Sequence, residues 1–510
     1  MKVTLISTST FPSDQGIRTI SAVLKKAGHS VRLVFMTLSE DYSRNYTKSE
    51  LLQLEKICKG SQLIGIASYA STAKRAYRII LNLKKLGVPI VYGGVHATIS
   101  PEDCINYADI VCVGEGEEAI LELTEALEKN KPIDKIKNLW IQREDKIIKN
   151  PVRNVIDNLD SLPFPDFEIE NQYVLERGKI RKFQEKDPSG QIFFLTGRGC
   201  PYGCDYCSNS FFNKLYEGKR KSILRWHSPE YIIKGILYMK DKFPTLNYFD
   251  IRDDTFSLRP LEDIKKFCSL YKEQVGMRFK CLGDPRTVTD EKIKLLVDAG
   301  CTDIIIGIQG SERVNREIYH RNQTNEYVLR AGKILNKYKD KLAVMYDVIT
   351  SNPYENPVDI ISLIRLLQKI PKPYYLSVNN LIFFPGTKLY QRAKADGTIR
   401  SEKDSAQFLN YWDRSKHILL KKKNIYLNLI LNLMRGPATE SRFGLMPNSL
   451  LNQLLKTSRV KRNLKNQFPS FLATKLLFVF DITRERILKP AYRSLPVSFK
   501  VWYDKVRYRV

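Results

Sequence analysis

The sequence predicts an α/β protein built from two successive α/β regions and a mostly helical C-terminal region. Short apolar runs alternate with helical patterns over residues 1–150 and again over residues 191–400. Such alternation predicts parallel sheets: a doubly wound, Rossmann-like sheet first, then a partial (β/α)6 barrel similar to a TIM barrel. After residue 400 the strand patterns stop, and 22 Lys and Arg stand against 7 Asp and Glu. The expected domains are therefore 1–150, 191–400 and 401–510, with 151–190 as a linker.

The first region contains five apolar runs typical of strands, separated by amphipathic helical stretches. Ligands bind such sheets at the carboxyl ends of the strands. Glycines gather at two of these ends, as Gly93 with Gly94 and as Gly114 with Gly116. The expected strands are 3–8, 31–36, 63–68, 89–94 and 109–114, and the expected helices include 16–29, 72–87 and 117–130.

The linker and the second region follow. Residues 157–171, DNLDSLPFPDFEIEN, are rich in proline and acid without a clear period, which is typical of a surface-packed connector. Helical patterns such as 229–240 and 290–300 then separate six apolar runs. A barrel of this type carries its chemistry at the carboxyl ends of its strands. The expected strands are 191–196, 246–251, 277–282, 302–308, 342–349 and 374–384.

The charge is strongly positive, at a formal +28, and residues 401–510 carry +15 of it. Usual partners of such a chain are nucleic acid, an anionic membrane surface or an anionic substrate; plain solubility is the alternative. The tail mixes apolar and basic residues at helical spacing, as in HILLKKKNIYLNLILNLM. Helices of this kind can lie on an anionic membrane, or can cap the open side of the barrel with a solvated basic face.

The cysteines and the N-terminus indicate a reduced compartment. The nine cysteines are an odd number, and six of them are scattered singly, unlike a secreted disulfide framework. The first residues, MKVTLISTST, predict a strand rather than a signal peptide. No run of 18 or more apolar residues predicts a spanning helix. We expect a cytoplasmic protein, with peripheral membrane contact through 401–510 as the variant.

The stretch RGCPYGCDYCSNS places Cys200, Cys204 and Cys207 in one short loop after the first strand of the second region. Soft thiolate ligands select zinc, copper(I) or iron–sulfur centres. Structural zinc requires four protein ligands, and His227 lies at no recognised zinc spacing. Three cysteines on four irons leave one iron without a protein ligand, which favours catalysis. Gly199 allows the loop to turn tightly, as does Gly203.

The C-x3-C-x2-C spacing, with Tyr206 before the last cysteine, resembles the signature of radical S-adenosylmethionine (SAM) enzymes. The resemblance implies a [4Fe–4S] cluster on Cys200, Cys204 and Cys207. It also implies SAM on the open iron, cleaved reductively to a 5′-deoxyadenosyl radical that abstracts hydrogen from the substrate. An external one-electron reductant, similar to flavodoxin or ferredoxin, is expected as partner.

The resemblance extends to residues that would contact SAM, the first of which is Tyr206 on the cysteine loop. FDIRDDTFS ends the second strand of the region, and Asp254, then Asp253, would hold the SAM amino group. A solvated pair of acids opening a helix is the alternative. Arg286 would pair with the SAM carboxylate, and Gln309 would reach its ribose. Gly310 departs from the serine that relatives commonly carry.

The first region resembles the cobalamin-binding domain found upstream in many such enzymes, most specifically over residues 92–120. From the glycines alone, a plain Rossmann-like nucleotide domain would be the simpler interpretation. The D-x-H-x-x-G motif, whose histidine ligates cobalt, is missing, and the first loop reads STFPSDQGIR. His96 is a candidate cobalamin contact, and the alternative is that it is a structural residue that hydrogen-bonds to neighbouring groups. The residues assigned to cobalamin are Gly93, Gly94, His96, Gly114, Glu115, Gly116 and Glu117.

The resemblance implies a cobalamin-dependent radical SAM enzyme. The expected reaction is methyl transfer from methylcobalamin to an unactivated carbon of a small molecule or lipid, with SAM and cobalamin as cofactors beside the cluster. The alternatives are an oxidative cyclase or rearrangement enzyme, an RNA-modifying methylthiotransferase-like enzyme, and a non-enzymatic iron–sulfur or cobalamin sensor. Nucleic acid is disfavoured as a partner, because the tail lacks an all-β RNA-binding pattern and Cys58, Cys104 and Cys112 are spread over different elements.

Overall fold

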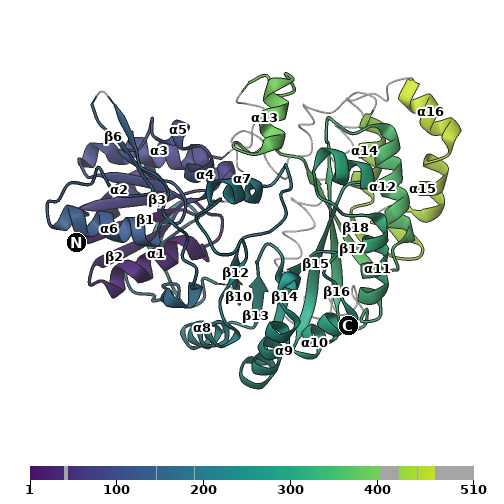
Figure 1. Cartoon of the computed structure of the whole chain (residues 1–510), viewed down its shortest axis with the longest axis horizontal. Coiled ribbons are helices and arrows are strands. Elements are labelled where there is room, and N and C mark those ends of the chain that lie inside the picture. The colour runs from purple at the N-terminus through teal and green to yellow at the C-terminus, as the bar shows by residue number, and fades with distance from the viewer. Residues whose placement is uncertain (39–43, 145, 189, 402–423, 445, 466–510) are drawn as a thin grey trace. The chain divides into compact units, whose positions relative to one another are not determined.

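The computed structural model describes residues 1–38, 44–144, 146–188, 190–401, 424–444 and 446–465 (Figure 1). The chain divides into two compact units. The first unit comprises Met1–Asp253 with Phe383–Asn410, and the second comprises Asp254–Ile382 with Tyr411–Val510.

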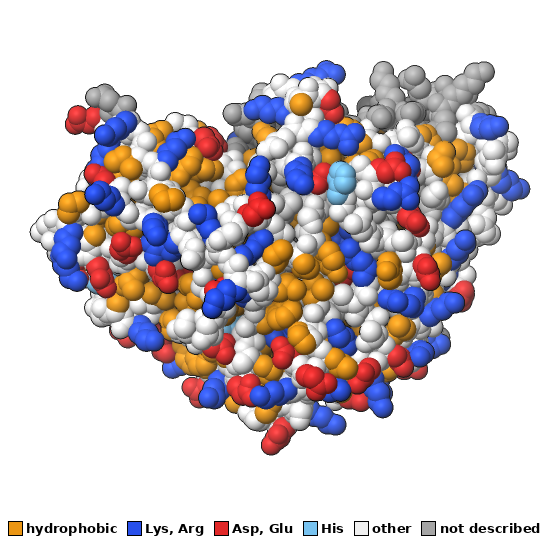
Figure 2. Space-filling model, viewed as in Figure 1, with side chains coloured by type: hydrophobic (Ala, Val, Ile, Leu, Met, Phe, Trp, Pro, Cys, Tyr) orange, Lys and Arg blue, Asp and Glu red, His pale blue; other side chains and the backbone are white. Residues whose placement is uncertain are grey.

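The surface charge is dispersed. Figure 2 shows Lys and Arg side chains scattered over the visible face, with Asp and Glu among them. On the described part of that face, the positive charge is therefore not gathered into one basic patch.

A nine-stranded sheet forms the N-terminal part of the first unit. Its strands are β1 (Lys2–Ser7), β2 (Ser30–Phe35), β3 (Leu63–Ala67), β4 (Ile90–Gly93), β5 (Ile110–Cys112), β6 (Leu139–Gln142), β7 (Ile147–Lys149), β8 (Gln172–Glu176) and β9 (Lys179–Lys182). Their order is β7-β6-β5-β4-β3-β1-β2-β8-β9. The central strands pair in parallel, and the outer strands β6, β7 and β9 pair antiparallel. All five predicted strands are present. The connector also supplies two strands that its composition did not predict. Strand β8 joins the sheet beside β2, and β9 pairs with β8.

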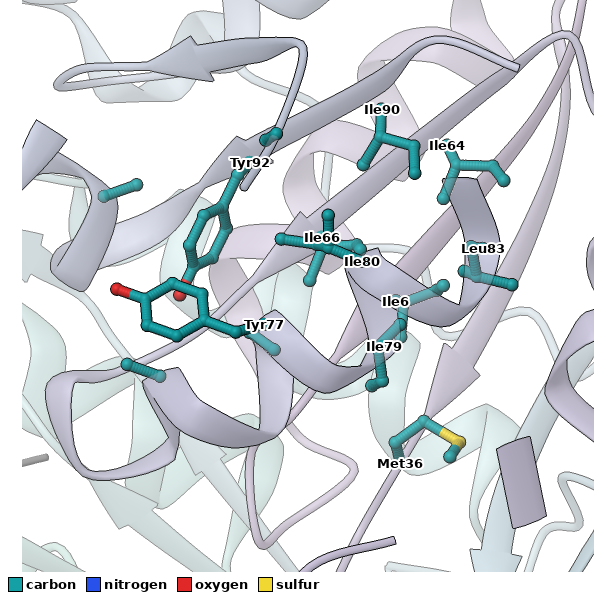
Figure 3. Packing of buried hydrophobic residues seen from close by; sticks show 14 of the residues in the cluster. Ile6, Met36, Ile64, Ile66, Tyr77, Ile79, Ile80, Leu83, Ile90 and Tyr92 are labelled. Atoms are coloured by element: carbon teal, nitrogen blue, oxygen red, sulfur yellow. The ribbon is translucent and has the colours of Figure 1, made fainter. Parts of the chain in front are cut away.

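Helices cover this sheet and bury its apolar residues. They are α1 (Gln15–Lys26), α2 (Lys48–Cys58), α3 (Ala73–Leu83), α4 (Gly94–Ile99), α5 (Pro101–Cys104) and α6 (Glu117–Glu128). Figure 3 shows Ile79, Ile80 and Leu83 of α3 packed against Ile64 and Ile90 of the sheet. All five side chains are fully buried, so this face is a closed core rather than a ligand site.

The remainder of the first unit carries the cysteine loop. Its elements are β10 (Gln191–Phe194), β11 (Gly197–Arg198), α7 (Ser208–Leu215), β12 (Arg225–Trp226), α8 (Pro229–Lys242), β13 (Tyr248–Ile251) and α13 (Lys388–Ala395). Strands β10 and β13 pair in parallel, and β11 and β12 pair antiparallel. The Ser228 hydroxyl caps α8 by accepting from the Tyr231 amide, and Pro229 occupies the first turn.

The second unit contains four parallel strands with their crossover helices. Its elements are α9 (Leu261–Leu270), β14 (Arg278–Gly283), α10 (Asp290–Asp298), β15 (Cys301–Gln309), α11 (Asn325–Asn336), β16 (Ala343–Thr350), α12 (Pro357–Lys369), β17 (Tyr374–Asn380), α14 (Ile425–Leu433), β18 (Gly436–Ala438), β19 (Arg442–Phe443), β20 (Met446–Pro447), α15 (Asn448–Leu454) and α16 (Thr457–Lys465). Strands β14 to β17 pair in parallel. With β10 and β13 they are the six strands that the sequence predicts, and the described strands do not close into a barrel.

The C-terminal region is only partly described. Strands β18 to β20 add an antiparallel edge to β17, which the sequence did not predict. Helix α14 is buried in the second unit, and its Asn428 side chain accepts a hydrogen bond from the Ser351 amide. The rest of the predicted basic helices, over 402–423 and 466–510, lies outside the described residues. No described helix is long and apolar enough to cross a membrane.

Candidate functional site

The three clustered cysteines lie on a loop that a short ribbon closes. In the ribbon, Gly197 of β11 pairs with Trp226 of β12. Gly199 turns the chain out of β11 with a φ of +95°, and a Cβ there would collide with the Ile223 carbonyl oxygen. Only glycine accepts both conditions without strain. The ribbon therefore closes a loop over residues 199–224 that contains all three cysteines and α7.

The thiols suit an iron–sulfur cluster. All nine cysteines are thiols rather than disulfides. Cys204 is buried, and Cys200 and Cys207 are half-buried. The Cys207 amide donates to the Cys204 carbonyl at 3.0 Å, and the Asn213 side chain donates to the Cys200 carbonyl at 2.9 Å. Among the described residues, no three His, Cys, Asp or Glu side chains converge to hold a single metal ion. A four-iron cluster has no such requirement, because each thiolate binds its own iron.

Asp253 holds the start of the loop. Its carboxylate accepts from the Thr196 amide at 2.6 Å, the Thr196 hydroxyl at 2.5 Å and the Gly197 amide at 3.1 Å. The side chain is almost fully buried. These contacts join the end of β13 to the segment between β10 and β11. The other predicted SAM contact in this unit, Tyr206, lies half-buried on the loop itself.

The remaining predicted SAM contacts, Asp254, Arg286 and Gln309, lie in the second unit. Asp254 is exposed. Arg286 follows β14 and donates through Nε and Nη2 to Asp284, both at 2.7 Å. Gln309 ends β15 with a φ of +68°. Both residues thus lie beyond carboxyl ends of neighbouring parallel strands.

Sequence reasoning missed the two charged residues that organise this cluster. Arg321 donates to Asp284 at 2.7 Å and to the Gly307 carbonyl at 3.2 Å, two residues before Gln309. Burial raises the pKa of Asp284, but Arg286 and Arg321 outweigh it and hold that pKa below its ordinary value. The carboxylate is therefore ionised and orients both guanidinium groups. The D-x-R spacing of Asp284 and Arg286 was visible in the sequence, whereas Arg321 carried no signal.

The predicted cobalamin contacts Glu115 and Glu117 are paired with arginines of the cysteine-loop ribbon. Glu115 Oε1 lies 2.6 Å from Arg225 Nη2 and 3.2 Å from Arg198 Nη1. Glu117 Oε1 lies 2.6 Å from Arg198 Nη2. Burial raises the pKa of Glu115, but Arg198 and Arg225 hold it below its ordinary value. Both carboxylates thus serve to hold the ribbon, and we drop them from the proposed cobalamin contacts.

The glycines predicted to contact cobalamin divide into two groups. Gly94 is exposed at the carboxyl end of β4, with a φ of +90°, and Gly93 is half-exposed. Strands β3 and β1 follow β4 in the sheet order, and the loop after each of them carries an exposed aromatic residue. The exposed fraction is 44% for Phe11, after β1, and 46% for Tyr69, after β3. Bare backbone and exposed rings at one sheet edge fit a flat, largely apolar macrocycle. Gly114 and Gly116 instead make room for protein, since a Cβ at Gly114 would collide with the Tyr216 hydroxyl.

His96 has no exposed surface and is part of the core. Its Nε2 lies 2.8 Å from the Tyr77 hydroxyl, which donates to Asp103 at 2.5 Å and so accepts from the imidazole. Burial lowers the pKa of His96 to about 4, so the ring is neutral at pH 7. These are the contacts of a structural histidine, and we drop His96 from the proposed cobalamin contacts because its ring does not reach the exposed edge.

Comparison with known families decides the identity of these two parts. The family model of the radical SAM superfamily matches residues 194–367, which include the cysteine loop. That of the B12 binding domain matches residues 1–124. The chain therefore carries a radical SAM domain after a B12-binding domain. Its cofactors are a [4Fe–4S] cluster, SAM and cobalamin, as these two domains together require, and the prediction of a cobalamin-dependent radical SAM enzyme is confirmed.

Characterised and uncharacterised relatives of this radical SAM protein are distant. An uncharacterized methyltransferase of Pyrococcus horikoshii is 26% identical over 345 residues, covering 66% of this chain and 70% of the relative. The bacteriochlorophyllide d C-8(2)-methyltransferase of Chlorobaculum tepidum is 24% identical over 348 residues, covering 67% and 70%. An anaerobic magnesium-protoporphyrin IX monomethyl ester cyclase of Cereibacter sphaeroides is 24% identical over 323 residues, covering 60% and 48%.

A solved structure shares the fold. The cobalamin-dependent SAM radical enzyme OxsB, solved with aqua-cobalamin and SAM bound, superposes with a TM-score of 0.62 at 15% identity. The match covers 100% of this chain and 75% of that one. The likeness confirms the predicted α/β fold.

Proposed function

We propose that this radical SAM protein methylates an unactivated carbon of a lipid or other small molecule. The observation that carries the proposal is the junction in the first unit, where Arg198 of the cysteine-loop ribbon pairs with Glu115 and Glu117 of the B12-binding domain. A loop fit for a cluster and a sheet edge fit for cobalamin are thereby held together. The relatives named as methyltransferases support this reaction.

When bound, the cluster with SAM would supply hydrogen-abstracting radical chemistry, and cobalamin would supply a methyl group. The chain's residues hold and orient these groups. We assign Cys200, Cys204 and Cys207 to the cluster and Gly93 and Gly94 to the cobalamin face. Asp253 and the ribbon fix the loop, in which the Cys204 side chain is buried.

For SAM, Arg286 and Gln309 are the proposed contacts that the structure organises. Arg286 is aligned by the buried Asp284, and Gln309 ends the next strand. A guanidinium group suits the SAM carboxylate, because its planar fork binds carboxylates in a defined geometry. Asp254 remains a proposed contact for the SAM amino group, since its carboxylate is exposed.

Two products of SAM test the reaction. The anaerobic, reconstituted protein with cobalamin, SAM and a reductant should form both 5′-deoxyadenosine and S-adenosylhomocysteine. The second product appears only when SAM gives up its methyl group. Formation of 5′-deoxyadenosine alone would instead favour the second candidate, an oxidative cyclase, which the similarity to the magnesium-protoporphyrin ester cyclase supports. Formation of neither product would contradict both.

Partners and location are part of the proposal. We infer an external one-electron reductant, similar to flavodoxin or ferredoxin, and a cytoplasmic protein. Burial of α14 in the second unit supports a helical cap for that segment of the tail. Peripheral membrane contact, if made, depends on the other basic segments of 401–510. Flotation with anionic liposomes tests this contact, and a tail-deleted protein that floats equally well would contradict it.

A further inference from the structure

The ribbon that closes the cysteine loop places two arginines directly opposite each other. Arg198 of β11 pairs with Arg225 of β12 across the antiparallel ladder. Like charges in this position destabilise a strand pair. Glu115 reaches both guanidinium groups, at 3.2 Å from Arg198 Nη1 and at 2.6 Å from Arg225 Nη2. One carboxylate of the B12-binding domain therefore offsets the repulsion within the ribbon.

The same turn of the B12-binding domain contacts the loop at further points. Glu117 pairs with Arg198 at 2.6 Å. The Glu115 amide donates to the Tyr216 hydroxyl at 2.7 Å, and that hydroxyl lies against Gly114. Residues 114–117 thus contact both ends of the loop, at Arg198 and Arg225, and its middle at Tyr216, which follows α7. Three of these contacts are partly buried ion pairs, and arginine forks tolerate little displacement.

This turn also follows β5, at the carboxyl edge of the sheet where the proposed function places cobalamin. A ligand that orders the turn will order the ribbon, and a cluster that orders the loop will order the turn. We propose that the turn Gly114–Glu117 couples cobalamin binding to cluster binding, with Glu115 as the positioning residue. The inference rests on the proposed function, because it takes the bound ligand to be cobalamin.

Coupling of this kind is reciprocal and measurable as a ratio of affinities. Equilibrium dialysis with hydroxocobalamin gives the dissociation constant of the anaerobic protein, once without iron and once after cluster reconstitution. In the wild-type protein, we expect the cluster to tighten cobalamin binding by at least about fivefold, the lower end of typical allosteric coupling. In Glu115→Gln, the ratio should fall towards one, because the only carboxylate that reaches both ribbon arginines among the described contacts loses its charge, and the Glu117–Arg198 pair alone leaves Arg225 unmatched.

A matched control comes from α6, the helix that follows the turn. Glu118 pairs with Arg153 at 3.1 Å and, among the described contacts, with neither ribbon arginine. Glu118→Gln should keep the wild-type ratio. Should Glu115→Gln fail to fold by circular dichroism, Arg198→Lys tests the same point, because it keeps the charge and loses the two-pronged contact. The electron paramagnetic resonance signal of the reduced cluster gives a second readout, the amount of cluster that each variant binds. A substitution that only damages the fold would lower this amount but leave unchanged the ratio of cobalamin affinities with and without the cluster.

Each outcome decides. A wild-type ratio near one would overturn the coupling while leaving the proposed function intact. A wild-type ratio retained in Glu115→Gln, or in Arg198→Lys if that variant is used, would overturn the role of the ribbon. Wild-type protein that binds no cobalamin in either state would overturn the proposed function, and the coupling with it.

Discussion

Asp253 allows a sharp test of whether its carboxylate holds the loop or binds SAM. Oδ1 accepts from two backbone amides, those of Thr196 and Gly197, and Oδ2 accepts from the Thr196 hydroxyl. In Asp253→Asn, the amide oxygen can replace Oδ1, and the hydroxyl can rotate to accept from the new NH2 group. All three hydrogen bonds survive, and only the charge is lost.

The two substitutions at this position therefore differ in size. An uncharged acceptor in place of a charged one costs about 1 kcal/mol here, because charge-assisted hydrogen bonds are roughly twice as strong. Asp253→Ala leaves the buried Thr196 amide and the half-buried Gly197 amide without an acceptor, at about 1–3 kcal/mol each, or about 2–6 kcal/mol together. Since about 1.4 kcal/mol corresponds to a factor of ten, the Thr196 and Gly197 amides should exchange about fivefold faster in the Asn variant and at least about thirtyfold faster in the Ala variant.

Hydrogen exchange by mass spectrometry of the anaerobic protein measures these rates on a peptide that spans β10 and β11. Iron content after reconstitution should follow the same order, falling more in Asp253→Ala than in Asp253→Asn. Equal loss of protection in the two variants would refute the hydrogen-bond reasoning. Wild-type protection in Asp253→Asn together with complete loss of SAM binding would show instead that Asp253 is a SAM ligand.

Two further predictions concern the loop and the core. Gly199→Ala should reduce the iron bound after reconstitution severalfold, because its Cβ collides with the Ile223 carbonyl; Gly203→Ala, which meets nothing within 4 Å, should bind iron normally. Burial lowers the pKa of His96 to about 4, so protonation of the ring opposes folding. The stabilisation of the folded state by the neutral ring is therefore complete above about pH 6.5 and is lost as the pH falls towards 4. Wild-type unfolding free energy should therefore drop over that range by up to about 3 kcal/mol more than that of His96→Gln, measured by denaturant unfolding, and equal pH profiles would contradict this.

The elements with strong local patterns could be predicted from the sequence. The run TDIIIGI lies within β15, and Gly93 ends β4 with Gly94 directly after it. The spacing of Cys200, Cys204 and Cys207 was sufficient for the superfamily, because the three thiolates of this motif all come from one short loop of the chain. Local signals of this kind do not depend on distant parts of the chain.

The contacts that organise the site could not be predicted, because they join residues far apart in sequence. Arg198 and Glu117 are separated by 81 positions, and either charge alone is typical of a solvated surface. Strand β8 has no distinctive pattern of its own and is stabilised by pairing with β2. The sequence alone assigned Glu115 to cobalamin, because nothing in it indicates that Arg198 and Arg225 pair with this carboxylate in the fold.

The most direct measurement is electron paramagnetic resonance of the reduced, reconstituted protein before and after addition of SAM. Three thiolates on four irons leave one iron open, so SAM binding there should change the g-values of the reduced cluster. The protein with all three of Cys200, Cys204 and Cys207 replaced by alanine should give no such signal. A four-iron signal that excess SAM leaves unchanged, or one that survives loss of the three thiols, would contradict the assignment of this loop.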